Sequence, residues 1–221
     1  MCGRFTIYSS PEVIQDYFEL TDLYPFIPSY NVAPSQTILA VRETENHQRV
    51  GVPLRWGLIP SWMKEENISS KLTNARVETV HEKPSFRKGF KSRRCLVVAD
   101  GYYEWNQEIT PKQPYYIHTK DNQLLAFAGI WEHWQNDEGK NIESCAIMTQ
   151  DANQQLSQVH SRMPVIIDHE HFKLWLDTNN QDVDKLRKLL SSIPYPTMTV
   201  NKVSSKVNNP RFNSPECIIN V

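Results

Sequence analysis

The sequence predicts an α+β fold, with one domain over residues 1–221, a mainly antiparallel, barrel-like β-sheet and short peripheral helices. Three observations favour this class. Apolar runs rich in β-branched and aromatic residues recur along the chain. Segments with helical periodicity are few and short. The two kinds of segment do not alternate regularly, as they would in a parallel βαβ sheet.

Strands are predicted where an apolar, β-prone run lies between turn residues. The run 94–100 holds consecutive apolar residues, which is typical of a strand buried on both faces. The runs 37–42 and 48–57 flank a polar stretch and are predicted to form a hairpin. The predicted strands cover 5–7, 37–42, 48–57, 94–100, 102–105, 115–119, 124–134, 143–149, 163–167, 197–203 and 217–220.

Helices are predicted where a capping residue precedes apolar residues spaced by about 3.6 positions. Ser10 and Pro11 suit the N-cap and first turn of the helix over 11–19. Residues 25–34 are expected to lack regular structure, because three prolines there each remove a backbone donor. The predicted helices cover 11–19, 74–80, 83–90, 151–158, 170–176 and 183–190.

The composition excludes several classes of protein. Hydrophobic residues make up 39% and charged residues 22%, which is typical of a globular chain. The formal net charge is −1, so contact with nucleic acid has to rest on a local basic patch. Neither a membrane-spanning run nor a signal peptide is expected, so we expect a cytoplasmic protein, associated with the nucleoid when bound to DNA if the source is bacterial.

The cysteines and histidines lack the spacing of a metal site. The four cysteines are scattered without a C-x-x-C pair and are expected to be reduced thiols. His169 and His171 have no nearby cysteine or third histidine, so they are expected on the surface where a helix begins. We therefore expect no metal and no cofactor.

Cys2 is the first candidate for chemistry. If Met1 is removed, Cys2 carries a thiol and a free α-amine on adjacent carbons. Reference pKa values of about 8.5 for the thiol and about 7.7–8.0 for the amine lie close to neutrality. Such an aminothiol condenses with an aldehyde to an imine, and its thiolate then closes a thiazolidine ring. The alternative is a frayed terminus with no chemical role.

Three polar residues could assist this chemistry. Glu104 lies between Tyr103 and Trp105, and a carboxylate among aromatic rings is either a structural ion pair or an acid–base group with a raised pKa. His160, at a predicted helix-to-strand junction, could exchange a proton near neutral pH or simply cap the helix. Asn74 could be a capping or turn residue, or could position a reactive group.

The segment 87–94 is the densest positive cluster of the chain. Such runs are usually solvated surfaces, but this one leads directly into the strand that precedes Glu104. With Arg4 and Arg162 added, and with aromatic side chains beside it, the cluster would suit single-stranded rather than double-stranded nucleic acid. The aromatic residues in question are Trp56, Trp62, Phe86 and Phe90.

Together these stretches resemble the SRAP family, the SOS-response-associated peptidases or abasic-site-processing proteins. The motifs run in the family's order over almost the whole chain. They are Met-Cys-Gly-Arg-Phe at 1–5, Tyr-Asn-Val-Ala-Pro at 30–34, Arg-Trp-Gly-Leu-Ile-Pro at 55–60, Asn-Ala-Arg-Val-Glu-Thr at 74–79, Phe-Arg-Lys-Gly-Phe at 86–90, Arg-Arg-Cys-Leu-Val-Val-Ala-Asp-Gly-Tyr-Tyr-Glu-Trp at 93–105, Phe-Ala-Gly-Ile-Trp at 127–131 and His-Ser-Arg-Met-Pro at 160–164.

The resemblance implies recognition of an abasic site in single-stranded DNA and capture of its ring-opened aldehyde as a thiazolidine on Cys2. By motif position, Glu104 would assist opening of the sugar and proton movement, His160 would donate and accept protons, and Asn74 would position the amine or sugar. The resemblance also implies self-cleavage that removes Met1. We expect a monomer with no membrane association. The residues expected to contact DNA are Arg4, Arg76, Arg162, Trp62, Asn31 and Pro34.

Two other functions remain possible at this point. Class II glutamine amidotransferases also begin with Cys-Gly after removal of Met, and in such an amidohydrolase the α-amine is the general base. A glutamine-binding arginine and an oxyanion hole from further motifs are not evident in the sequence. The other alternative is a single-strand or modified-base binding module without chemistry, in which Cys2 would not affect DNA affinity.

Overall fold

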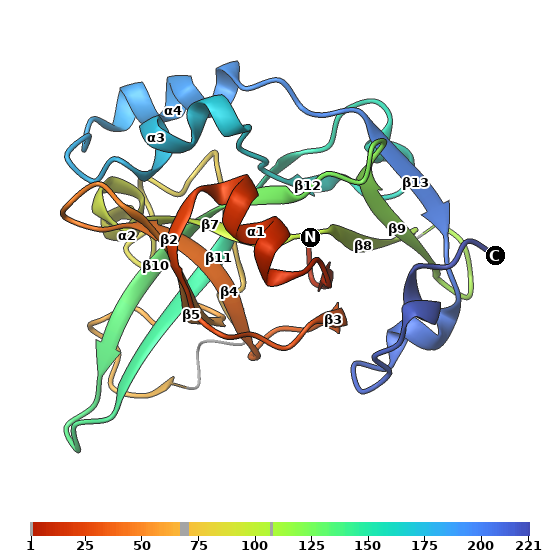
Figure 1. The fold of residues 1–221 in the computed structure, drawn as a ribbon, viewed down its shortest axis with the longest axis horizontal. Helices are drawn as coiled ribbons and strands as arrows, with labels where there is room; N and C mark the ends of the chain where they lie inside the picture. The colour runs from red at the N-terminus through yellow and green to blue at the C-terminus, as the bar shows by residue number, and fades with distance from the viewer. Residues whose placement is uncertain (1, 67–70, 107) are drawn as a thin grey trace.

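The computed structural model describes residues 2–66, 71–106 and 108–221, and shows two β-sheets with short helices at the periphery (Figure 1). The smaller sheet has the strand order β13 (Met198–Lys202), β9 (Gln113–Thr119), β8 (Gly101–Asn106), β1 (Phe5–Ile7) and β3 (Ser29–Val32). All of its strand pairs are antiparallel.

The larger sheet closes into a five-stranded barrel. Its order is β12 (Arg162–Pro164), β11 (Asn141–Asp151), β10 (Leu125–Gln135), β7 (Arg94–Ala99), β4 (Thr37–Glu43), β5 (Arg49–Trp56) and β2 (Leu20–Leu23), and β6 (Asn74–Arg76) pairs with β11. Closure comes from a parallel pairing of β11 with β5, in which Cys145 lies opposite Trp56. The predicted α+β class with a barrel-like sheet is confirmed.

The helices are short and lie outside the sheets (Figure 1). The α-helices are α1 (Pro11–Phe18), α2 (Arg87–Ser92), α3 (Phe172–Leu176) and α4 (Val183–Ser192). The 3₁₀ turns are η2 (Leu156–Gln158), η3 (His169–His171), η4 (Ser205–Asn208) and η5 (Pro215–Ile218). The Ser10 side chain accepts from the Val13 N–H and caps α1, as predicted. Asp182 caps α4 in the same way.

Arg94 fixes the strand that leads to the candidate site. Its guanidinium is 1% exposed and donates to the main-chain carbonyls of Trp175 at 2.6 Å and Phe90 at 3.0 Å. The remaining acceptors are the carbonyls of Lys91, Asp177 and Asn180. A buried cation thereby satisfies carbonyl groups at the ends of α2 and α3, which would otherwise lack partners.

Several predicted elements differ from the structure because tertiary pairing overrides local propensity. Residues 74–80 are not a helix, since β6 pairs in parallel with Ile147–Thr149 of β11 and turns follow it. Residues 217–220 are not a strand: η5 ends at Ile218, and one bridge joins Asn220 to Val203. The region expected to be irregular contains β3, which pairs with β1.

The remaining differences concern the length of the predicted helices and strands, and one strand that was missed. Within 83–90, turns precede α2, which runs from Arg87 to Ser92. Within 151–158 the only helical residues are those of η2. The predicted strand over 163–167 shortens to β12, followed by an isolated bridge at Ile166. Strand β2 was not predicted.

Candidate functional site

Cys2 is buried at the start of β1. Its exposed fraction is 0%, and its main-chain carbonyl accepts a hydrogen bond of 2.9 Å from the Asn74 side-chain amide. Burial, reinforced by the neighbouring charge of Glu104, raises the pKa of the Cys2 thiol well above its usual range. The thiol is therefore protonated at neutral pH and needs a base to become a nucleophile.

Asn74 reaches Cys2 because β6 lies on β11, with Asn74 opposite Ile147. Its amide nitrogen also approaches the Thr73 hydroxyl at 3.2 Å. Its side-chain oxygen is buried and accepts no hydrogen bond from any residue that the structure describes. Asn74 thus positions the Cys2 main chain and keeps one acceptor for another group.

Glu104 approaches Cys2 from β8, the strand that pairs with β1. The carboxyl group is 4% exposed, and burial raises its pKa to about 7. A hydrogen bond from the Trp105 backbone acts in the opposite direction. A carboxyl group that titrates near neutral pH can both accept and donate a proton there, which is what general acid–base catalysis requires.

His160 follows η2 and Val159, and lines a pocket of about 230 Å³. The Arg162 backbone N–H donates to its Nδ1 at 2.9 Å, so the proton of the neutral ring is assigned to Nε2. Burial lowers the pKa of His160, which favours this neutral form. The Asn106 side chain donates to the Gln158 carbonyl at 3.1 Å and so joins the end of β8 to the turn before His160.

Arg4 and Asn31 form one hydrogen-bonded unit. The Arg4 Nη1 donates to Asn31 Oδ1 at 2.7 Å and to the Val207 carbonyl at 2.8 Å, and its guanidinium lies 5.8 Å from the centre of the Trp105 ring. Asn31 is 1% exposed, and its amide nitrogen donates to the carbonyls of Val207, Asn209 and Phe212. In this structure, Asn31 therefore orients Arg4.

Arg162 is enclosed by acceptors. Its two terminal nitrogens bind the two Glu78 carboxylate oxygens at 2.8 and 3.0 Å. It also donates to Asp151 and to the Thr149 carbonyl. Its exposed fraction is 9%, whereas the neighbouring Arg76 is exposed. Of this pair, Arg76 presents the more accessible cation.

The basic cluster expected over 87–94 is only partly accessible, since Arg87, Lys88 and Lys91 are exposed but the rest of the cluster is not. Arg94 is buried among carbonyls, and Arg93 forms an ion pair with Glu132. Three of the four aromatic residues expected to flank it, Trp56, Phe86 and Phe90, are 0–5% exposed and belong to the core. Trp62 is 61% exposed and Pro34 is half-buried, so a ligand can contact the side chains of both.

A family model described as SOS response associated peptidase (SRAP) matches residues 1–210. This chain belongs to the SRAP family. Of its motif residues, Asn74 of β6 and Glu104 of β8 lie beside Cys2.

Named relatives of this SRAP protein come from bacteria, a phage and vertebrates. The Bacillus subtilis abasic site processing protein YoaM is 44% identical, with 99% of this chain and 97% of that protein covered. YoqW of the same organism is 45% identical, with 99% of both covered. The mouse abasic site processing protein HMCES is 35% identical, covering 99% of this chain and 75% of its own length.

Solved structures agree with the SRAP fold. A Bacteroides thetaiotaomicron protein superposes with a TM-score of 0.86 at 26% identity, over 100% of both chains. A phage-related protein of Bordetella bronchiseptica gives a TM-score of 0.73 at 29% identity, over 91% of this chain and 94% of that one.

Sequence reasoning missed a tyrosine pair beside the site. The hydroxyls of Tyr102 and Tyr195 lie 3.2 Å apart. Burial is the main reason that the pKa of Tyr195 is raised, and the charges of Cys2 and Glu104 add to it. Tyr102 could have been found, since it lies two residues from Glu104 on one strand face. Tyr195 follows α4 and carries no such signal.

Two further findings concern metal binding and membrane-spanning helices. Within 2–66, 71–106 and 108–221, no group of three or more His, Cys, Asp or Glu side chains is arranged to hold a metal ion. Of the helices that the structure describes, none is long and apolar enough to cross a membrane.

Proposed function

We propose that this SRAP protein recognises abasic sites in single-stranded DNA and holds them as a covalent thiazolidine on Cys2, shielding the lesion during the DNA damage response. The convergence of Asn74 and Glu104 on Cys2 carries the proposal. The names of the relatives, abasic site processing proteins, support this substrate class.

The proposed chemistry begins once Met1 has been removed and the α-amine is free. The amine attacks the aldehyde of the ring-opened deoxyribose, and loss of water gives an imine. The Cys2 sulfur then bonds to the imine carbon while the nitrogen gains a proton, which closes the ring. The balance is one aldehyde and one aminothiol giving one thiazolidine and one water.

Glu104 is the proposed proton carrier of this sequence. With a pKa of about 7 it can protonate the sugar oxygen or the departing hydroxyl, and as the carboxylate it can accept the thiol proton. The thiol needs that base because burial keeps it protonated. His160 is proposed to donate from Nε2 and to accept a proton during imine formation and reversal.

DNA contact is proposed to use Arg4, Arg76 and Arg162 at phosphates, with Trp62 and Pro34 against unstacked bases. Asn31 is proposed to act through Arg4. A single strand is favoured because it can turn its damaged nucleotide toward the buried Cys2, whereas a bulky, rigid duplex would clash around a buried residue.

Removal of Met1 is proposed to occur by self-cleavage, as the family name peptidase suggests. We propose that the protein acts as a monomer without membrane association. The intact mass of the purified protein tests self-cleavage. Wild type is expected to lose Met1, and Glu104→Ala is expected to retain it. Loss in both would assign the cleavage to a host aminopeptidase.

The function is tested with single-stranded DNA carrying one abasic site, resolved on a denaturing gel. Wild type is expected to give a heat-resistant shifted band. Cys2→Ser keeps the α-amine and is expected to give only a labile imine, trapped when borohydride is added. Equal, heat-resistant shifts with Cys2→Ala would contradict the proposal and favour non-covalent binding or another nucleophile.

A further inference from the structure

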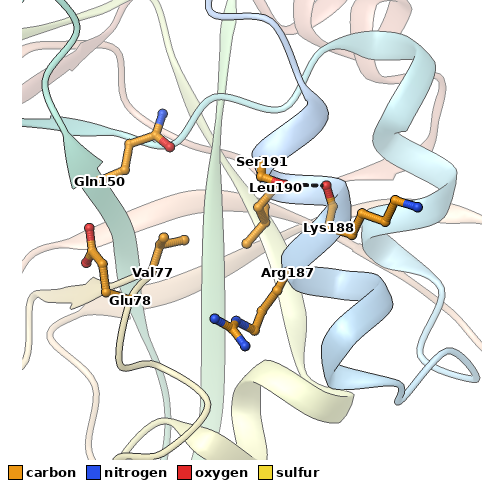
Figure 2. Close-up of a pocket in the computed structure, with 7 residues that line it drawn as sticks. All are labelled: Val77, Glu78, Gln150, Arg187, Lys188, Leu190 and Ser191. Carbon is orange, nitrogen blue, oxygen red and sulfur yellow. Dashed lines mark hydrogen bonds between the residues drawn. The ribbon is translucent and has the colours of Figure 1, made fainter.

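A pocket of about 450 Å³ lies between the turn after β6, the end of β11 and helix α4 (Figure 2). Its walls include the apolar side chains of Val77 and Leu190 and the polar side chains of Glu78, Gln150 and Arg187. Figure 2 shows the guanidinium of Arg187 directed from α4 toward the β-strands, whereas the carboxylate of Glu78 extends along the side of the strands away from α4. No part of the proposed capture chemistry uses this space.

The pocket lies at the end of β6, the strand that carries Asn74. Val77 is three residues after Asn74, a separation of about 10 Å at the rise of an extended chain. Glu78 binds both terminal nitrogens of Arg162, whose backbone N–H in turn holds His160. A DNA strand with its lesion at Cys2 and a phosphate at the exposed Arg76, which directly precedes Val77, would therefore bring a neighbouring nucleotide to this pocket.

The side chains suit a nucleobase better than a phosphate. Glu78 stays ionised, because its hydrogen bonds from Arg162 lower its pKa, and an anion in the wall repels phosphate. The ammonium of Lys188, another lining residue, extends from α4 away from the β-strands (Figure 2). A carboxylate has about four acceptor positions, so two remain after Arg162 for an amino group of a base. The Gln150 amide can both donate and accept, which is the pattern that pairs with adenine.

Arg187 supplies a planar surface for stacking. Its contact with Asp184 is 3.9 Å long and solvent-exposed, so it holds the guanidinium only weakly. Guanidinium planes stack on bases that have left the helical stack. Val77 and Leu190 offer apolar contact to the remaining ring surface.

We propose that this pocket receives the base of a nucleotide next to the lesion and prefers a base with an exocyclic amine, adenine above all. Gln150 and Glu78 read the edge of the base, and Arg187 stacks on its face. The inference rests on the proposed function, since it requires single-stranded DNA in the Cys2 site.

The test measures affinity separately from covalent capture. The full-length protein is titrated into fluorescent oligonucleotides with a stable tetrahydrofuran abasic analogue, which cannot form the aldehyde. Each of the three nucleotides on either side is set in turn to adenine, thymine or a second base-free sugar. At one position, replacing adenine by thymine or by the base-free sugar is expected to raise Kd by about fivefold or more.

Substitutions of the pocket residues test whether the preference for adenine arises in this pocket. Gln150→Ala is expected to abolish the difference between adenine and thymine, and Arg187→Ala to raise Kd about fivefold for the adenine oligonucleotide. Lys185→Ala is the matched control, since it removes one charge from α4 outside the pocket. Its Kd should rise less than twofold. Thermal melting of each variant establishes that it is folded.

Two results would overturn the pocket assignment: no flanking position with a base dependence, or a dependence that persists in both Gln150→Ala and Arg187→Ala. A parallel gel with aldehyde-bearing DNA separates the two proposals. If wild type forms the adduct but shows no base dependence, only the pocket assignment fails. If wild type forms no adduct, the proposed function fails.

Discussion

The side-chain amide of Asn74 donates a 2.9 Å hydrogen bond to the main-chain carbonyl of Cys2, across 72 positions of sequence. Residues near a chain end are usually mobile unless they are tied down. Here the bond anchors the candidate nucleophile to β6, which is itself held by β11. The bond holds the Cys2 main chain near Glu104, whose charge acts on the Cys2 thiol.

Asn74→Ala is expected to slow adduct formation about 10–100-fold, because the reacting amine and thiol lose their orientation. The free energy of unfolding should fall by only about 1 kcal/mol, the usual net value of one hydrogen bond. Single-turnover gel kinetics and urea denaturation measure the two effects. Asn141→Ala, which removes the same side chain from an exposed position, is the control. Equal rates for the two variants would exclude the positioning role.

Glu104→Gln is expected to change the pH dependence of both stability and rate. The carboxyl pKa is raised to about 7 by burial, above the ordinary value of 4.5, so the folded protein holds more protons than the unfolded chain between these values. Wild-type stability should therefore fall by roughly 2–3 kcal/mol as the pH rises from 4.5 through 7. Glu104→Gln removes this loss because its amide does not ionise.

The same substitution should remove the inflection near pH 7 from the rate of adduct formation and lower the rate about 10²-fold or more. Urea denaturation at several pH values, paired with single-turnover rates, measures both changes. A wild-type rate that does not vary between pH 6 and pH 8 would argue against Glu104 as the proton carrier.

His160→Ala is expected to slow adduct formation or its reversal about 10²-fold, with a change in stability of less than about 1 kcal/mol. His160→Gln keeps a hydrogen-bond donor but cannot exchange a proton, so no rescue is expected. His133→Ala, on the exposed side of β10, serves as the matched control. Forward and reverse rates follow from chasing the adduct with excess competitor DNA. Full activity of His160→Gln would show that His160 acts only through a hydrogen bond and transfers no proton.

Arg94→Met is expected to lower the free energy of unfolding by about 3–5 kcal/mol, because buried carbonyls at the ends of α2 and α3 lose their donor. Arg87→Met, on the exposed first turn of α2, should change it by less than about 0.5 kcal/mol. Urea denaturation of both variants makes the comparison. A similar, small effect for both would show that the carbonyl contacts of Arg94 contribute little.

The sequence predicts the strands that are buried on both faces and the capped helices, because periodicity and caps are local signals. Strand β7 and helix α1 are examples. Strand β6 could not be predicted, since only the pairing of Asn74–Arg76 with β11 makes it extended. The same holds for the turn at Cys217, where residues 217–220 have strand-like composition but meet no partner strand beyond one bridge.

Family motifs name the residues that converge on Cys2, but they carry no information on burial or partners. The segment 87–94 shows the difference: its charges look like a track in sequence, while in space Arg94 is a core residue and Arg93 is paired. Tyr195 joins the site only through the fold, across 93 positions from Tyr102. Such contacts depend on how the sheets and helices pack together, which local patterns do not encode.

Intact mass spectrometry of the covalent product tests the central claim most directly. Wild-type protein is incubated with a short single-stranded oligonucleotide containing one abasic site, denatured, and weighed without a reducing agent. The account predicts one species, with the mass of the chain beginning at Cys2 plus the oligonucleotide less one water, and with fragments that place the link at Cys2. A product that retains Met1, or one linked at another residue, would contradict it.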